Sequence, residues 1–127
     1  MAGVTYDTGA LVAAERNDRR MWALHAGFMA EETVPVVPAP VLAEAWRGGA
    51  RQASLSRLLA PCDVEPMTDL QARAVGTLAA RAGHDDVVDV TVVEGAIRRR
   101  HAIVTSDEGH IRKIAVAARV ALRIESV

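Results

Sequence analysis

Four acidic residues of this 127-residue chain have the side chains and local surroundings to bind a metal ion together: Asp7, Glu44, Asp89 and Asp107. Asp7 ends the apolar segment that begins at Val4, and Asp107 follows the apolar segment 102–105 by two residues. Carboxylates that crowd together repel one another and raise one another's pKa. A divalent cation resolves that conflict, and an all-oxygen ligand set favours Mg²⁺ or Mn²⁺ over Zn²⁺.

A site of this kind suits hydrolysis of a phosphodiester bond. A divalent cation activates water and offsets the charge of the acids, and a second one can stabilise the leaving oxygen. Asp86 is an additional candidate ligand, because Asp86 and Asp89 are three residues apart and share one face of a first helical turn. Taken alone, Asp7 and Asp107 are better explained as helix caps, Asp86 and Asp89 as first-turn acids, and Glu44 as a surface residue. The hypothesis therefore depends on a fold that brings them together.

Alternating strands and helices are the elements expected to position these acids. We expect strands at residues 4–7, 34–37, 62–65, 102–105 and 121–124. Helices are expected at 10–16, 19–31, 41–46, 52–59, 68–81, 87–100 and 108–118. This order predicts one α/β domain over residues 1–127, a three-layer α/β/α fold with a mostly parallel central sheet. Ligands of such sheets bind beyond the carboxyl ends of the strands, where all four acids should project.

The composition narrows the function classes. A formal net charge of -1 gives no strong overall attraction to nucleic acid, and an aromatic content of 3% argues against a base-stacking platform. As a group, the basic residues of the last third could bind phosphates or an acidic partner, although a solvated helical face explains any one of them better. They are Arg98, Arg99, Arg100, Arg112, Lys113, Arg119 and Arg123.

The single cysteine, Cys62, excludes an intramolecular disulfide and is interpreted as a small buried hydrophobe. The first residues include Asp7 and no basic run, which does not fit a signal peptide. No segment approaches 18 apolar residues free of charge, so no transmembrane helix is expected. These features together predict a cytoplasmic protein.

Three blocks of the sequence resemble the PIN-domain family. They are VTYDTGALVAAE, PAPVLAEAWR and HDDVVDVTVVEGAIRRRHAIVTSDEGHI. Their identity, order and spacing match the family over nearly the whole chain, with one departure: Val90 follows Asp89 where the family usually has alanine. The size of the chain is similar to that of VapC-type toxins, which are ribonucleases inhibited by a cognate VapB-type antitoxin.

The resemblance implies an endoribonuclease that cleaves RNA with Mg²⁺ or Mn²⁺. It assigns metal binding to the four acids named above, with Asp86 nearby. By the family pattern, Thr105 and Ser106 position Asp107 or a water on the metal, and Thr8 does the same beside Asp7. All three are also good helix-start residues.

The resemblance also implies partners. A VapB-like antitoxin and a second copy of the chain, in a homodimer, are expected by analogy with VapC-type toxins. Trp22, Phe28 and Trp46 could line an apolar groove for the antitoxin, although a core role is the ordinary one for aromatic residues.

Other readings of the acids remain open. The chain could be a PIN-fold binding module without activity, although the four acids are intact. A receiver-type phosphoacceptor domain needs an acid pair after its first strand and a late-strand lysine, whereas Thr8 follows Asp7 and Lys113 falls in an expected helix. A haloacid-dehalogenase-like phosphatase needs a second acid two residues after Asp7, where Gly9 stands.

Overall fold

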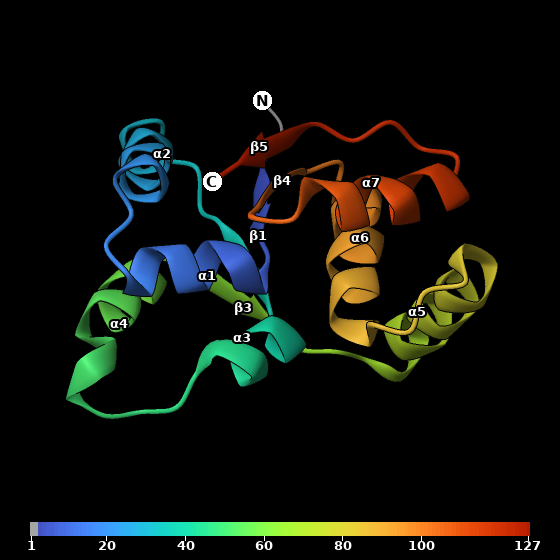
Figure 1. The fold of residues 1–127 in the computed structure, drawn as a ribbon, viewed down its shortest axis with the longest axis horizontal. Helices are drawn as coiled ribbons and strands as arrows, with labels where there is room; N and C mark the ends of the chain where they lie inside the picture. Colours follow the sequence, from blue (N-terminus) through green and yellow to red (C-terminus); the bar gives the residue numbers. More distant parts are fainter. Residues whose placement is uncertain (1–2) are drawn as a thin grey trace.

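A computed structural model describes residues 3–127, and Figure 1 shows a central sheet between two groups of helices. The strands are β1 (Val4–Tyr6), β2 (Val36–Pro38), β3 (Asp63–Glu65), β4 (Ala102–Thr105) and β5 (Ile124–Ser126). They pair in the order β3-β2-β1-β4-β5, and each of these pairings is parallel. The predicted α/β fold with a mostly parallel sheet is therefore confirmed.

Helices cover both faces of the sheet. One group comprises α1 (Thr8–Glu15), α2 (Arg19–Ala30), α3 (Ala39–Ala45) and α4 (Ala53–Leu59), with the short 3-10 helix η1 (Ala50–Gln52) before α4. The other group comprises α5 (Asp69–Ala82), α6 (Val87–Arg99) and α7 (Glu108–Ala117). In Figure 1 the sheet separates α1, α2 and α4 from α5, α6 and α7, while α3 contacts both α1 and α6. The expected three-layer arrangement is confirmed.

The central strand β1 directs its side chains alternately to the two helical layers. The Tyr6 hydroxyl lies 2.8 Å from His25 Nδ1, and its ring packs beside Phe28, so Tyr6 faces α2. The Thr5 hydroxyl instead lies 3.0 Å from His101 Nδ1, which follows α6. Because side chains alternate along an extended backbone, Asp7 is carried to the same side as Thr5, toward α6.

Two of the expected strands lie elsewhere than predicted. The strand expected at 121–124 is β5, which begins only at Ile124, because its pairing with β4 starts where Ile124 meets Ile103. The strand expected at 34–37 begins after Pro35 and ends with Pro38. In both cases the apolar run was visible in the sequence, but the register against the neighbouring strand sets the bounds.

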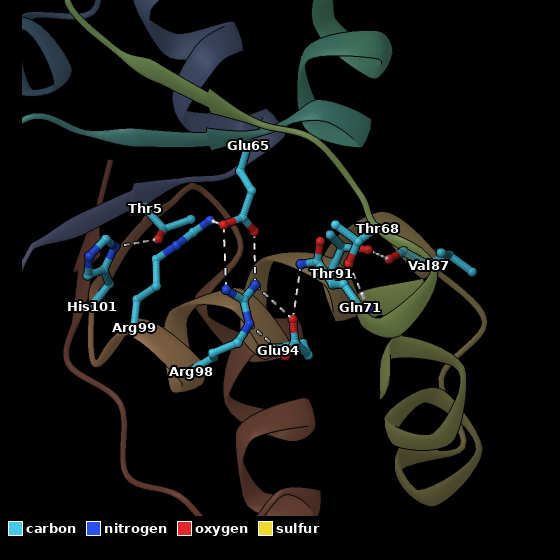
Figure 2. Close-up of polar contacts among 10 residues, drawn as sticks. All are labelled: Thr5, Glu65, Thr68, Gln71, Val87, Thr91, Glu94, Arg98, Arg99 and His101. Carbon is cyan, nitrogen blue, oxygen red and sulfur yellow. Dashed lines mark hydrogen bonds and ion pairs between the residues drawn. The ribbon is translucent and has the colours of Figure 1, made fainter. Parts of the chain in front are cut away.

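A cluster of charged side chains ties the edge strand β3 to the layer formed by α5 and α6. Figure 2 shows Glu65 of β3 between Arg98 and Arg99 of α6, with Glu94 on the other side of Arg98. Gln71 of α5 donates to the same Glu94 carboxylate at 3.0 Å. Two of the arginines that could have bound phosphates therefore already have carboxylate partners within the protein.

Replacing Glu65 with glutamine is expected to lower the free energy of unfolding by about 1–3 kcal/mol. The side chains of Arg99 and Glu65 are only 16% and 22% exposed, so the change leaves a half-buried guanidinium without its counter-ion. Urea unfolding measures the effect. Asp69→Asn, which breaks an exposed pair with Arg73, is the control and should cost at most about 0.5 kcal/mol. Equal effects of the two variants would contradict a structural role for this cluster.

Candidate metal centre at the carboxyl end of the sheet

The order of the strands reverses at β1, where this fold class is expected to have a crevice beyond the carboxyl ends of β1 and β4. From β1 the chain first adds β2 and β3 on one side, and then crosses to β4 and β5 on the other side. At such a reversal the connections after two adjacent parallel strands lead away from each other, which leaves room for a ligand. Asp7 directly follows β1, and Asp107 follows β4, its neighbour in the sheet.

Asp7, at the carboxyl end of β1, is buried, with only 4% of its surface exposed. Its carboxylate accepts a hydrogen bond from Ala10 N at 2.9 Å and so caps α1. The Thr105 hydroxyl lies near enough to lower the pKa of Asp7, against the larger effect of burial. Burial raises the pKa of Asp7 to about 6, and the charges of Asp89 and Asp107 push it in the same direction. The charges of two other candidate acids, Asp89 and Asp107, thus reach Asp7.

Asp89 lies in the first turn of α6, half-buried. Burial raises the pKa of Asp89, and the charge of Asp86 adds to that effect. Asp86 itself caps α6, because its carboxylate accepts hydrogen bonds from the backbone N–H groups of Val88 and Asp89. Asp86 is therefore close to the centre and also has a structural task of its own.

Asp107 is exposed at the rim and caps α7, where its side chain accepts from His110 N. A side-chain hydrogen bond with His110 holds the pKa of Asp107 below its usual value. The Thr105 hydroxyl accepts from Asp107 N at 2.8 Å, and it also acts on the pKa of Asp7. Ser106 packs on α1: a Cβ added at Gly9 would collide with its side chain.

Glu44 stands apart from the other three acids. It is exposed on α3, whereas the carboxylates that act on Asp7 are those of Asp89 and Asp107. Its helix does contact α6, the helix that carries Asp89. Asp89 and Asp107 therefore both act on the charge of Asp7, whereas Glu44 has no such link and stays a candidate from the sequence alone.

The donors fit a hard divalent cation in their chemistry. They are carboxylates, two of them with pKa values raised by burial, and two nearby buried atoms, Thr8 Oγ1 and His84 Nε2, lack a hydrogen-bond partner. Within residues 3–127, however, no three His, Cys, Asp or Glu side chains lie close enough together to hold an ion as they stand. The side chains would have to move closer to one another around a bound ion.

Comparison with protein families decides the classification. Residues 4–117 match the PIN domain. The chain belongs to the PIN-domain family. This confirms the resemblance that the sequence blocks indicated, and the residues of the crevice all fall within the matched segment.

Solved structures share the fold of this PIN domain at low sequence identity. The structure of VapBC2 from Rickettsia felis, bound to a DNA fragment from its promoter, has a TM-score of 0.70 and 15% identity, covering 98% of both chains. FitAB bound to the IR36 DNA fragment has a TM-score of 0.68 and 12% identity, covering 97% of this chain and 94% of that one. PAE2754 from Pyrobaculum aerophilum has a TM-score of 0.66 and 17% identity, covering 97% and 83%. No curated protein sequence matches the chain.

Two histidines of the PIN domain that the sequence interpretation passed over stand beside the acids. His84 Nε2 lies 3.5 Å from Asp89 Oδ2, and His110 Nδ1 is hydrogen bonded to Asp107 Oδ2. The sequence held a partial signal, because His110 comes three residues after Asp107 and so shares a helix face with it. His84 lies in a loop, where spacing does not predict the direction of a side chain.

The three aromatic residues considered for a groove have different surroundings. Trp22 donates to Ala14 O and lies beneath Arg57, and Phe28 packs against the core. Trp46 is 43% exposed and lines an apolar groove of about 630 Å³ between α3 and α4. The other lining residues are Ala39, Leu42, Ala43, Ser56, Leu59 and Ala60.

Two further predictions from the sequence can be compared with the structure. Burial, together with the charge of Asp63, raises the pKa of Cys62 to about 12, which agrees with its interpretation as an inert, partly buried residue. Among the described helices, none is both long and apolar enough to cross a membrane.

Proposed function

We propose that this PIN-domain protein is a metal-dependent endoribonuclease, the toxin of a toxin–antitoxin pair. The observation that carries the proposal is the convergence of Asp7, Asp89 and Asp107 at the crevice beside β1, in a chain that belongs to the PIN-domain family. Their separate positions after β1, in α6 and before α7 mean that helix capping alone does not account for the grouping.

In this proposal Asp7, Asp89 and Asp107 hold Mg²⁺ or Mn²⁺. Glu44 would join them from α3, with Asp86 as a further ligand or a nearby support. When bound, such a cation supplies activation of water and stabilisation of the charge that develops on the phosphate. Asp7 and Asp107 are held by the helices that they cap, and Asp89 lies in the first turn of α6.

Hydroxyl groups at the crevice support the acids. Thr105 accepts from Asp107 N and acts on the pKa of Asp7, so its hydroxyl lies between the two acids that follow β1 and β4. Thr8 offers a buried hydroxyl without a partner beside Asp7, and Ser106 is exposed next to Asp107. We propose that these two position a water or a substrate phosphate.

The test is cleavage of a mixed pool of single-stranded and structured RNA by the purified protein. We expect cleavage with Mn²⁺ and none with EDTA. Cleavage that persists in EDTA would overturn the metal dependence. No cleavage of any RNA under either condition would favour a PIN-fold binding module over a nuclease. A parallel pool of DNA of the same sequences would show whether RNA is the preferred substrate.

The proposed partners are a VapB-like antitoxin and a second copy of the chain. Two of the structural neighbours are toxin–antitoxin complexes, and the apolar groove beside Trp46 has the character needed for an apolar antitoxin segment. We expect the product of the adjacent gene, when co-expressed, to form a stable complex with this chain. Trp46→Ala should weaken that complex at least about tenfold, because truncation of a central aromatic anchor costs about 2 kcal/mol or more. An unchanged dissociation constant would exclude the groove as the contact.

A further inference from the structure

Two imidazoles connect two of the candidate metal-binding carboxylates. His84 Nε2 lies 3.5 Å from Asp89 Oδ2, and His110 Nδ1 is hydrogen bonded to Asp107 Oδ2. The rings of His84 and His110 are in edge contact, with centroids 5.7 Å apart and planes at 62°. The four side chains thus form a continuous series, Asp89–His84–His110–Asp107, which we call the imidazole bridge.

The imidazole bridge joins two separate elements of the fold. His84 belongs to the loop between α5 and α6, and its backbone N–H donates to Ala79 O at 3.1 Å. Gly83 before it has a φ of 60°, a left-handed conformation that glycine adopts without strain. His110 lies in the first turn of α7. The loop therefore places the His84 ring across the crevice, against a ring from another helix.

The two histidines differ in exposure in a way that bears on their role. The His84 side chain is 11% exposed, and its Nε2 is fully buried without a hydrogen bond. The His110 side chain is 59% exposed, and its ring is in edge contact with the less exposed His84 ring. An ordinary surface ion pair would not require a buried ring on one side. The burial of His84 therefore indicates that the ring has a fixed position beside Asp89.

We propose that His84 and His110 are positioning residues that orient the carboxylates of Asp89 and Asp107 for metal binding. This inference rests on the proposed function, since it concerns the same centre. His110 already holds one oxygen of Asp107 by a hydrogen bond, and a small shift of either side chain would turn the 3.5 Å approach of His84 Nε2 to Asp89 Oδ2 into a second one. Supporting hydrogen bonds of this kind typically change metal affinity 10- to 100-fold. Because the two rings are in edge contact, a change at one ring is expected to alter the orientation of the carboxylate beside the other ring.

The test uses substitutions that separate the hydrogen bond from the ring. His84→Phe and His110→Phe retain an aromatic ring without the N–H, whereas His84→Gln and His110→Asn retain a donor. We expect the Phe variants to bind Mn²⁺ about 10- to 100-fold more weakly by calorimetric titration, and the amide variants to recover much of the loss. Because the rings touch, the loss in the double Phe variant should be smaller than the sum of the two single losses.

His101→Phe is the matched control, because its ring is hydrogen bonded to Thr5 and precedes β4 at the other end of the strand. It should leave Mn²⁺ affinity unchanged. Pulsed EPR of bound Mn²⁺ adds an independent readout, since an imidazole nitrogen that ligates the metal directly gives strong ¹⁴N modulation. We expect no such modulation from either histidine.

Three results would overturn the inference. Mn²⁺ affinities of the Phe variants within about twofold of the wild type would show that the imidazole bridge does not position the acids. Strong ¹⁴N modulation that disappears in a Phe variant would make that histidine a direct ligand instead. If the wild-type protein binds no Mn²⁺, both the proposed function and this inference fail. If all variants bind Mn²⁺ and cleave RNA normally, only this inference fails. If His84→Phe does not fold, the Mn²⁺ affinity of His110→Phe still tests the inference, because the His110 side chain is exposed.

Discussion

Replacing Asp7 with asparagine is expected to lower the rate of RNA cleavage by at least about 100-fold while the fold is retained. Asp7 is the most buried acid of the crevice, and it lies within the electrostatic influence of both Asp89 and Asp107. The asparagine removes one negative charge from the proposed metal centre. It can still cap α1, because its amide oxygen can accept the hydrogen bond from Ala10 N. The measurement is the single-turnover rate at saturating Mn²⁺.

Asp18→Asn is the matched control for this variant. Asp18 caps α2 by accepting from Met21 N at 2.9 Å, so the two substitutions make the same chemical change at the same kind of helix position. The control should cleave RNA at the wild-type rate. If Asp7→Asn is fully active at equal metal concentration, or if both variants lose activity equally, the assignment of Asp7 to the catalytic centre is wrong.

The fold was predictable because hydrophobic pattern and strand–helix alternation are local in the sequence. The strand that carries Thr105 was placed correctly at residues 102–105, since it is a short apolar run bounded by His101 and Ser106. The last strand was misplaced by three residues at its start, because a register depends on the partner strand and not on the run itself.

The candidate site was predictable only in part. Asp7 and Asp107 could be placed together, because parallel neighbouring strands end at the same edge of a sheet. Glu44 was included because of the resemblance to PIN domains. It is exposed on α3, and it is not among the acids whose charge acts on Asp7. The contact between His84 and His110 joins residues 26 positions apart, one of them in a loop, and only the packed fold reveals it.

In metal-free buffer, Asp7→Asn is expected to be more stable than the wild type at about pH 7.5, by up to about 3 kcal/mol. Burial raises the pKa of Asp7 from 3.8 to about 6 in the folded protein. Below pH 3.8 the carboxyl group is protonated in both the folded and the unfolded protein, so it does not lower the free energy of unfolding. As the pH rises through the higher value, the folded state must hold a buried charge that the unfolded state solvates freely, and stability is lost. Asparagine has no such charge.

Urea unfolding in EDTA at several pH values measures this difference, which should shrink steadily toward about pH 4. Adding Mn²⁺ should reverse the order, because a cation that binds the three carboxylates stabilises the wild type and has less to bind in Asp7→Asn. A wild type that is the more stable protein in EDTA at every pH would mean that Asp7 is only a favourable helix cap. Asp7→Asn is thus expected to raise stability without metal and to lower RNA cleavage. A buried acid that serves only the fold would not show these opposite effects.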